Sequence, residues 1–99
     1  MKKIPNEEII DAMEGMLNIA SDSTRLKILY SLLGEEEKSV SQIVEEIGAS
    51  QSLVSHQLKV LKDAELIDNR KDGTRVYYFL KDEHVRALLE VVYEHVIEK

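Results

Sequence analysis

The chain has 99 residues and a formal net charge of −6, which suits one domain with a modest core. It contains no cysteine, and this excludes disulfides, thiolate metal sites and cysteine nucleophiles. No apolar stretch is long enough to span a membrane, and the lysines at the start are not followed by the apolar segment of a secretory signal, so we expect a cytoplasmic protein.

Two helices are predicted in the first third of the chain. Asn6 is a suitable N-cap for the first and Ser23 for the second, and Gly34 is expected to stop the second. The apolar positions at helical spacing are Ile9, Ile10, Met13, Leu17 and Ile19, followed by Leu26, Ile28, Leu29, Leu32 and Leu33. The acidic run over residues 35–38 is predicted to be a solvated loop.

The next two predicted helices form a helix-turn-helix. Ser39 or Ser41 begins the first of them, which ends at Gly48. Ser50 begins the second, which is predicted over residues 50–63. The apolar side chains of this second helix are Leu53, Val54, Leu58 and Leu61. Two short helices joined by a tight turn that contains glycine are typical of the helix-turn-helix motif.

After Leu66 the apolar pattern changes from helical to strand-like. Residues 66–71 and 74–80 are predicted to be strands. Asp72 and Gly73 are predicted to form the hairpin turn, because both residue types tolerate the positive φ that such turns need.

A last helix is predicted over about residues 82–97. The order of elements then indicates a mainly α fold with a β-hairpin wing, which is a winged helix-turn-helix. Residues 1–99 form a single domain in this interpretation, with a recognition helix at about 50–63 and a wing at about 66–80.

The charge distribution favours a nucleic-acid partner despite the negative total. Residues 51–81 carry six basic and four acidic groups, and they are the only third of the chain with a positive net charge. The predicted recognition helix and wing present polar side chains suited to phosphates and base edges: Gln51, Ser52, Ser55, His56, Lys59, Arg70, Lys71 and Arg75. The alternatives are ordinary solvated faces, or a protein–protein module whose positive patch is incidental.

Two stretches carry a family resemblance: ASDSTRLKIL at residues 20–29 and SQSLVSHQLKVLK at residues 50–62. They resemble the ArsR/SmtB family of bacterial metal-sensing repressors, and the resemblance extends from about Ile9 to Glu98. It implies a winged-helix homodimer in which the first and last helices form the dimer interface. It also implies that the partner is double-stranded DNA with an inverted-repeat operator. The residues that would face this DNA are Ser52, Ser55, His56 and Gln57.

The last predicted helix carries four candidate metal ligands, Asp82 and His84 near its start and His95 and Glu98 near its end. His84 and His95 return to nearly the same face but lie roughly 16 Å apart along the axis, so one ion cannot contact both. If two copies pair antiparallel across a twofold axis, each end meets the opposite end of its partner. Two nitrogens and two carboxylates suit tetrahedral Zn(II), and also Co(II).

The spacing of these four residues does not decide whether they bind a metal ion. Asp82 is equally well placed as an N-cap, Glu98 is common at a helix end, and helix histidines are more often surface residues. The helix has two apolar stripes, which indicates one face in its own core and one against a partner. One stripe contains Leu88 and Val91, which lie near the line that joins His84 and His95 along the helix. The other stripe contains Val85, Leu89, Val92 and Val96.

The zinc-sensing branch of the family is similar in placing Asp-x-His and then His-x-x-(His or Glu) on its last helix. That resemblance implies that Asp82, His84, His95 and Glu98 bind zinc. Co(II) and Ni(II) are alternative effectors, because the ligands that suit these metals overlap. We therefore expect a repressor that a divalent metal releases from its operator. The alternative is an ArsR-like repressor that does not respond to metal. An enzyme is not expected, because no nucleophile–base arrangement stands out and a closed site of this type leaves no open coordination position.

Overall fold

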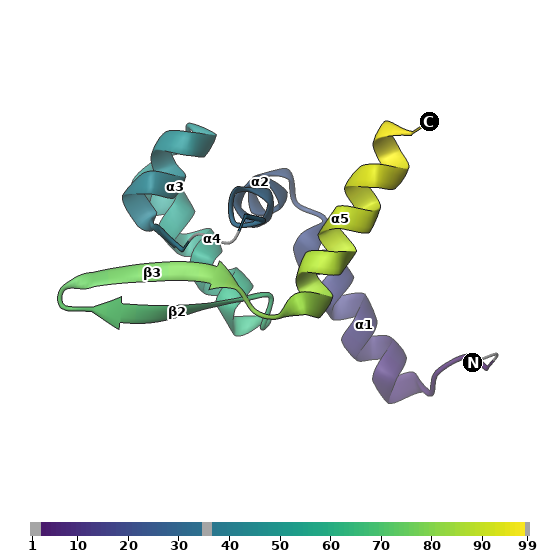
Figure 1. Ribbon diagram of the computed structural model, residues 1–99. Helices are drawn as coiled ribbons and strands as arrows, with labels where there is room; N and C mark the ends of the chain where they lie inside the picture. Colours follow the sequence, from purple (N-terminus) through teal and green to yellow (C-terminus); the bar gives the residue numbers. More distant parts are fainter. Residues whose placement is uncertain (1–2, 35–36, 99) are drawn as a thin grey trace.

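The computed structural model describes residues 3–34 and 37–98. Its elements in chain order are α1 (Glu7–Ala20), α2 (Ser23–Ser31), β1 (Lys38–Ser39), α3 (Val40–Ile47), α4 (Gln51–Asp63), β2 (Ile67–Asp72), β3 (Arg75–Leu80) and α5 (Glu83–Ile97). The strands form one antiparallel sheet in the order β1-β3-β2. In Figure 1 the β2–β3 hairpin extends to one side of the α2–α4 body, and α1 and α5 project to the other. The predicted winged helix-turn-helix is confirmed.

Capping side chains define most helix starts. The side chains of Asn6, Ser39 and Ser50 each accept a hydrogen bond from a backbone N–H in the first turn of the helix that follows. Of the two serines proposed for the start of α3, Ser39 is therefore the cap. Gly48 ends α3 with φ of 73°, a left-handed conformation that favours glycine.

The ends of α2 differ from the prediction. Its N-cap is Asp22, not Ser23, because the Asp22 carboxylate accepts the backbone N–H of Arg25 at 3.0 Å. The helix stops at Ser31, before the predicted stop at Gly34. Its last turn tightens into i→i+3 hydrogen bonds, which satisfy the terminal carbonyls without a glycine.

The turn of the wing is displaced by one residue from the prediction. Asp72 pairs with Arg75, so the turn residues are Gly73 and Thr74. Of these two, only Gly73 has a positive φ, at 66°. A hairpin turn with glycine in its first central position accounts for this geometry, and pairing along the whole hairpin fixes the register.

The strand β1 was not predicted. Lys38 and Ser39 pair with β3, so the prediction of a solvated loop is wrong at Lys38. The Lys38 ammonium also forms an ion pair with Glu46 of α3 at 2.6 Å. The rest of the predicted loop lies partly outside the described residues, at 35 and 36.

The core lies between α2, α3, α4, the base of the hairpin and the first half of α5. Its buried apolar residues are Ile28, Leu29, Leu32, Ile43, Val54, Leu58, Leu61, Leu66, Ile67, Leu80, Val85 and Leu89. Of the four apolar residues at helical spacing on α4, Val54, Leu58 and Leu61 are fully buried, whereas Leu53 is 39% exposed. No helix within residues 3–34 and 37–98 is long and apolar enough to cross a membrane.

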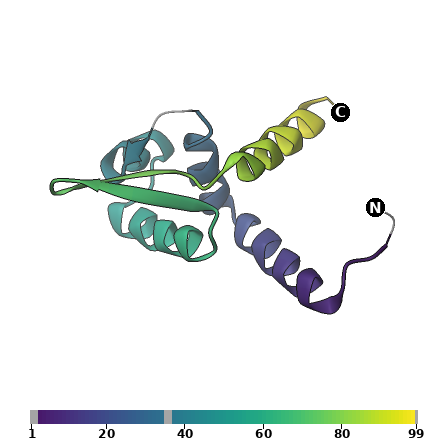
Figure 2. The ribbon, with the colours of Figure 1, turned by 60° about the horizontal axis from the view of Figure 1, so that its bottom comes forward.

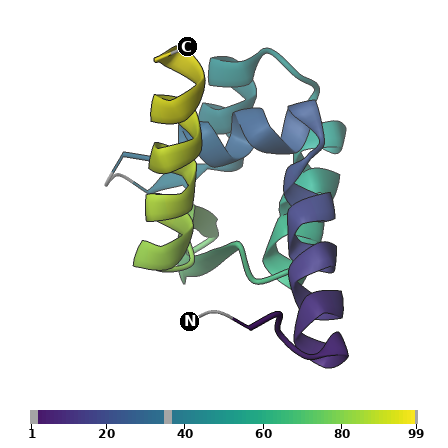
Figure 3. The same ribbon diagram turned by 90° about the vertical axis from the view of Figure 1, so that its right-hand side faces the viewer.

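The two helices that leave the body expose apolar side chains. α1 has no buried residue, and α5 buries only Val85 and Leu89. Figure 2 shows both helices extending away from the rest of the chain, and in Figure 3 α5 lies at the left and α1 at the right, in front of the other helices. Their exposed large apolar residues, here called the α1/α5 apolar surface, are Ile9, Met13, Met16 and Leu17 on α1, with Leu88, Val91, Val92, Tyr93, Val96 and Ile97 on α5.

Candidate nucleic-acid and metal-binding surfaces

The outer face of α4 is polar and accessible. Its exposed residues include the predicted DNA contacts Gln51, Ser52, Ser55, His56 and Lys59. The Lys59 ammonium lies 3.1 Å from the Asp63 carboxylate, one turn further along the same face. An exposed pair of this kind stabilises a helix by only about 0.3–0.5 kcal/mol, so a phosphate can displace the carboxylate.

Gln57 is placed differently from its neighbours. It is half-buried, and its Oε1 accepts a hydrogen bond from Arg25 Nη1 at 2.8 Å. The resemblance implied that Gln57 faces the operator, whereas the structure directs its amide oxygen toward α2. Helical spacing places residue 57 at the border between the apolar and polar faces of α4, and the sequence gives no sign of a partner on another helix.

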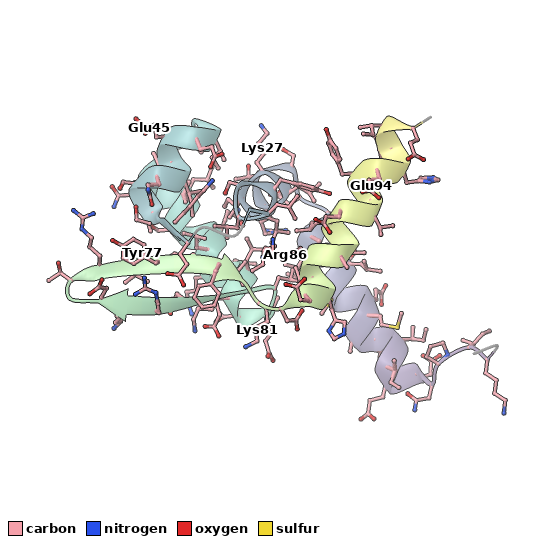
Figure 4. All side chains as sticks on the ribbon, in the orientation of Figure 1. Lys27, Glu45, Tyr77, Lys81, Arg86 and Glu94 are labelled. Atoms are coloured by element: carbon pink, nitrogen blue, oxygen red, sulfur yellow. The ribbon has the colours of Figure 1, made fainter. Side chains whose placement is uncertain are left out.

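On the wing, the three predicted cationic contacts differ in their surroundings. Arg70 Nε donates to the Glu37 carboxylate at 2.5 Å, and its guanidinium lies 5.1 Å from the centre of the Tyr77 ring, which is labelled in Figure 4. Lys71 and Arg75 are exposed and form no ion pair within residues 3–34 and 37–98. Lys71 and Arg75 are therefore the wing cations with the least competition from carboxylates.

A shallow hollow of about 340 Å³ lies where the wing turn meets the first residues of α3 and α4. Among the residues that the structure describes, its lining contains no carboxylate and consists of Ser39, Val40, Ser41, Gln51, Thr74, Arg75 and Val76. Sequence reasoning assigned Ser39 and Ser41 only to capping and did not single out Thr74. Hydroxyl groups beside a guanidinium suit a phosphate oxygen, and only the fold shows that these residues meet.

At the base of the wing, Lys81 is paired with acidic side chains. Its ammonium lies 3.3 Å from the Asp68 carboxylate and 3.9 Å from that of Glu65. The backbone N–H of Asn69 and the hydrogen bond from Lys81 hold the pKa of Asp68 below its usual range. This end of the wing is therefore a structural ion-pair cluster, and the unpaired cations lie closer to its tip.

The four candidate metal ligands lie at the two ends of α5. Asp82 is the N-cap, as the alternative interpretation expected: its Oδ1 accepts the Val85 backbone N–H at 3.1 Å. Its other oxygen, Oδ2, lies 3.9 Å from His84 Nδ1, so capping leaves one carboxylate oxygen beside the imidazole. His95 and Glu98 are exposed at the opposite end. Within the described part of a single chain, no three potential ligands come together, so a site of four ligands requires a second chain.

Hydrogen bonds hold α5 to α2. The Tyr30 hydroxyl donates to the Leu89 carbonyl at 2.7 Å, and burial raises the pKa of Tyr30. The Arg86 guanidinium, labelled in Figure 4, donates to the carbonyl of Leu33 just beyond α2. The rings of Tyr30 and Tyr93 also lie 6.3 Å apart. The first three turns of α5 are therefore attached to α2 and the residues that follow it by two hydrogen bonds and a ring contact.

Comparison with known proteins matches this chain to transcriptional regulators. Residues 22–69 match the model for the bacterial regulatory protein, arsR family. The cadmium resistance transcriptional regulatory protein CadC of Listeria innocua is 40% identical over 80 residues, which cover 81% of this chain and 67% of that protein. The arsenical resistance operon repressor of Bacillus subtilis is 37% identical, with 83% of this chain and 78% of that protein covered.

A similar solved structure is a homodimeric winged helix-turn-helix DNA-binding domain from Mycobacterium bovis. It is 27% identical with a TM-score of 0.85, and the match covers 99% of this chain and 92% of that one. Our chain spans about two thirds of the length of the CadC protein that it matches.

Proposed function

This chain belongs to the ArsR family of bacterial regulatory proteins, and on that basis we propose that it is a homodimeric transcriptional repressor that zinc releases from DNA. The observation that carries the proposal is the composition of α5. This helix has nitrogen and oxygen donors exposed at both ends and apolar side chains exposed between them. Such a helix suits antiparallel pairing with a second copy of itself.

DNA binding rests on α4 and the wing. A recognition helix in the major groove contacts the base edges with its exposed polar face. On α4, Ser52, Ser55 and His56 supply hydrogen-bond donors and acceptors for this contact. Lys71, Arg75 and the hydroxyl groups that line the hollow beside the wing suit the phosphate backbone. This local positive surface is what allows a chain with a net charge of −6 to bind a polyanion.

The proposed dimer interface is the α1/α5 apolar surface. Isolated exposed apolar residues are ordinary on a protein, but ten large ones gathered on two projecting helices indicate a contact surface. The Mycobacterium bovis domain of similar fold is a homodimer. In a twofold dimer the two recognition helices would meet two half-sites about 34 Å apart along the DNA.

The proposed metal site combines Asp82 and His84 of one subunit with His95 and Glu98 of its partner. Relatives of this chain are named for resistance to cadmium and arsenicals. Because this chain has no cysteine, its own site has only nitrogen and oxygen ligands, which favours zinc, with cobalt and nickel as alternatives. The bound ion would join the subunits at two symmetric positions.

Release requires that metal bind the DNA-free dimer more tightly than the DNA-bound dimer, and DNA must then weaken metal binding by the same factor. The hydrogen bonds from α2 to α5 give a physical basis for this coupling. A change in how two α5 helices pack would move α2, and with it the recognition helix of each subunit.

The test starts with a duplex that the wild-type protein enriches from a random-sequence pool. Zinc is titrated into the protein–duplex complex, and fluorescence anisotropy of the labelled DNA reports release. His95→Gln should keep its DNA affinity and lose release by zinc. Glu94→Gln is the matched control, since Glu94 is an exposed carboxylate on the same helix outside the proposed ligand set (Figure 4). Failure to enrich any duplex would refute DNA recognition, and zinc release that persists in His95→Gln would refute the site.

A further inference from the structure

Arg25, near the start of α2, connects two other helices. Its Nε donates to the Ile19 carbonyl in the last turn of α1 at 2.6 Å, and its Nη1 donates to Gln57 Oε1 on α4 at 2.8 Å. Its own backbone N–H is held by the capping carboxylate of Asp22. Arg25 and Gln57 are both half-buried, so these hydrogen bonds are partly shielded from water.

This link matters because α1 has few other attachments. α1 buries none of its own residues, and its main neighbour in the chain is α2. The proposed function places α1 in the dimer interface and α4 in the DNA groove. One guanidinium therefore joins the helix that meets the partner subunit to the helix that meets the DNA.

We infer that Gln57 is a positioning residue: through Arg25 it fixes the orientation of α4 relative to α1, and so the placement of the two recognition helices in the dimer. It does not read bases. The inference rests on the proposed function. Hydrogen bonds to a charged group are stronger than neutral ones, and a half-buried guanidinium that loses its acceptor is costly. A small rotation of α4 is also amplified at half-sites about 34 Å apart.

Substitution of Gln57 by Glu separates positioning from base recognition. A glutamate keeps the oxygen that accepts from Arg25 and adds a charge that strengthens this bond. A glutamate in contact with DNA would instead be repelled by the phosphates and would change which base is preferred. Gln57→Met keeps the length of the side chain but removes the acceptor, while the bond from Arg25 to the Ile19 carbonyl remains.

The experiment compares two duplexes of equal length, one that the wild-type protein enriches from a random pool and a scrambled version. We expect Gln57→Met and Arg25→Met each to weaken binding to the enriched duplex about tenfold or more, and binding to the scrambled duplex about twofold or less. The double variant should bind like Arg25→Met alone, because both changes break the same bond. Gln57→Glu should bind within about threefold of wild type, with the same preferred sequence.

Ser55→Ala serves as the control for base recognition, since Ser55 is exposed on α4 and should change the preferred sequence. Thermal unfolding of each variant separates a loss of positioning from a loss of folding. Gln57→Met is the less invasive of the two single changes, because Arg25→Met also removes the bond to the Ile19 carbonyl. Wild-type-like binding by a folded Gln57→Met, additive effects in the double variant, or an altered preferred sequence in Gln57→Glu would overturn the inference. If the wild-type protein enriches no duplex, the proposed function itself has failed.

Discussion

The replacement Lys71→Ala tests the role of the wing in DNA binding. Lys71 lies on β2 two residues before the turn, is exposed, and forms no ion pair among the described residues. A cation that contacts a phosphate displaces a condensed counterion, which adds about 0.9 to the slope of log affinity against log salt. A dimer contains two copies of the wing, so Lys71→Ala should lower the absolute slope by about 1.8.

This change of slope corresponds to a large difference in salt sensitivity. Between about 50 mM and about 200 mM salt, wild type should lose roughly twelvefold more affinity than Lys71→Ala. The loss should be similar on the enriched duplex and on a scrambled one, because phosphate contacts carry no sequence information.

Fluorescence anisotropy over a range of salt concentrations measures the slope directly. Lys27→Ala is the matched control: Lys27 is also an exposed lysine, but it lies on the side of α2 away from the hairpin (Figure 4). Its slope should equal that of wild type. If Lys71→Ala keeps the wild-type slope, or if Lys27→Ala loses as much, the wing does not contact the backbone as described.

Three other changes test the core, the dimer and the wing base. Leu58→Ala removes a fully buried side chain of α4 and should lower the free energy of unfolding by about 2–5 kcal/mol, as measured by urea denaturation; a loss under 1 kcal/mol would contradict the packing. Val91→Glu adds a charge to the α1/α5 apolar surface, where Val91 is 61% exposed, so light scattering should show a folded monomer, and an intact dimer would place the interface elsewhere. Asp68 has a folded pKa below its unfolded value, so its contribution to stability is present above the unfolded value of about 3.9 and declines as pH falls through the folded pKa. Asp68→Asn should therefore be less stable than wild type at neutral pH, and urea unfolding curves should converge in acid; a constant difference at all pH values would contradict this.

The helix starts could be predicted because they depend on residues close in sequence. Asn6, Ser39 and Ser50 each bond a backbone N–H in the next turn, and Gly48 takes the left-handed conformation that ends a helix. The prediction of Ser23 as the cap of α2 is wrong by one residue, because Asp22 and Ser23 are both good capping residues and are adjacent in sequence. Only the surrounding fold distinguishes them.

Features that depend on distant partners could not be predicted. The strand β1 has two residues and exists only through its pairing with β3. The wing turn lies one residue later than predicted, because pairing along the whole hairpin sets the register and the Asp72-Gly73 dipeptide alone does not. The bond between Gln57 and Arg25 spans 32 residues of sequence. For the candidate metal site, the sequence indicates which residues could bind, but a single chain does not bring its two halves together.

The central claim is that each metal ion bridges Asp82 and His84 of one subunit and His95 and Glu98 of the other. Coexpression of His84→Gln and His95→Gln chains with two different tags, both free of histidine, allows the mixed dimer to be purified. In a twofold dimer the mixed species carries one site with both substitutions and one site with neither. Zinc titration monitored by calorimetry should show one site of wild-type affinity per mixed dimer, and only weak binding by either parent homodimer. Mixed dimers that bind zinc no better than their parents would contradict the claim.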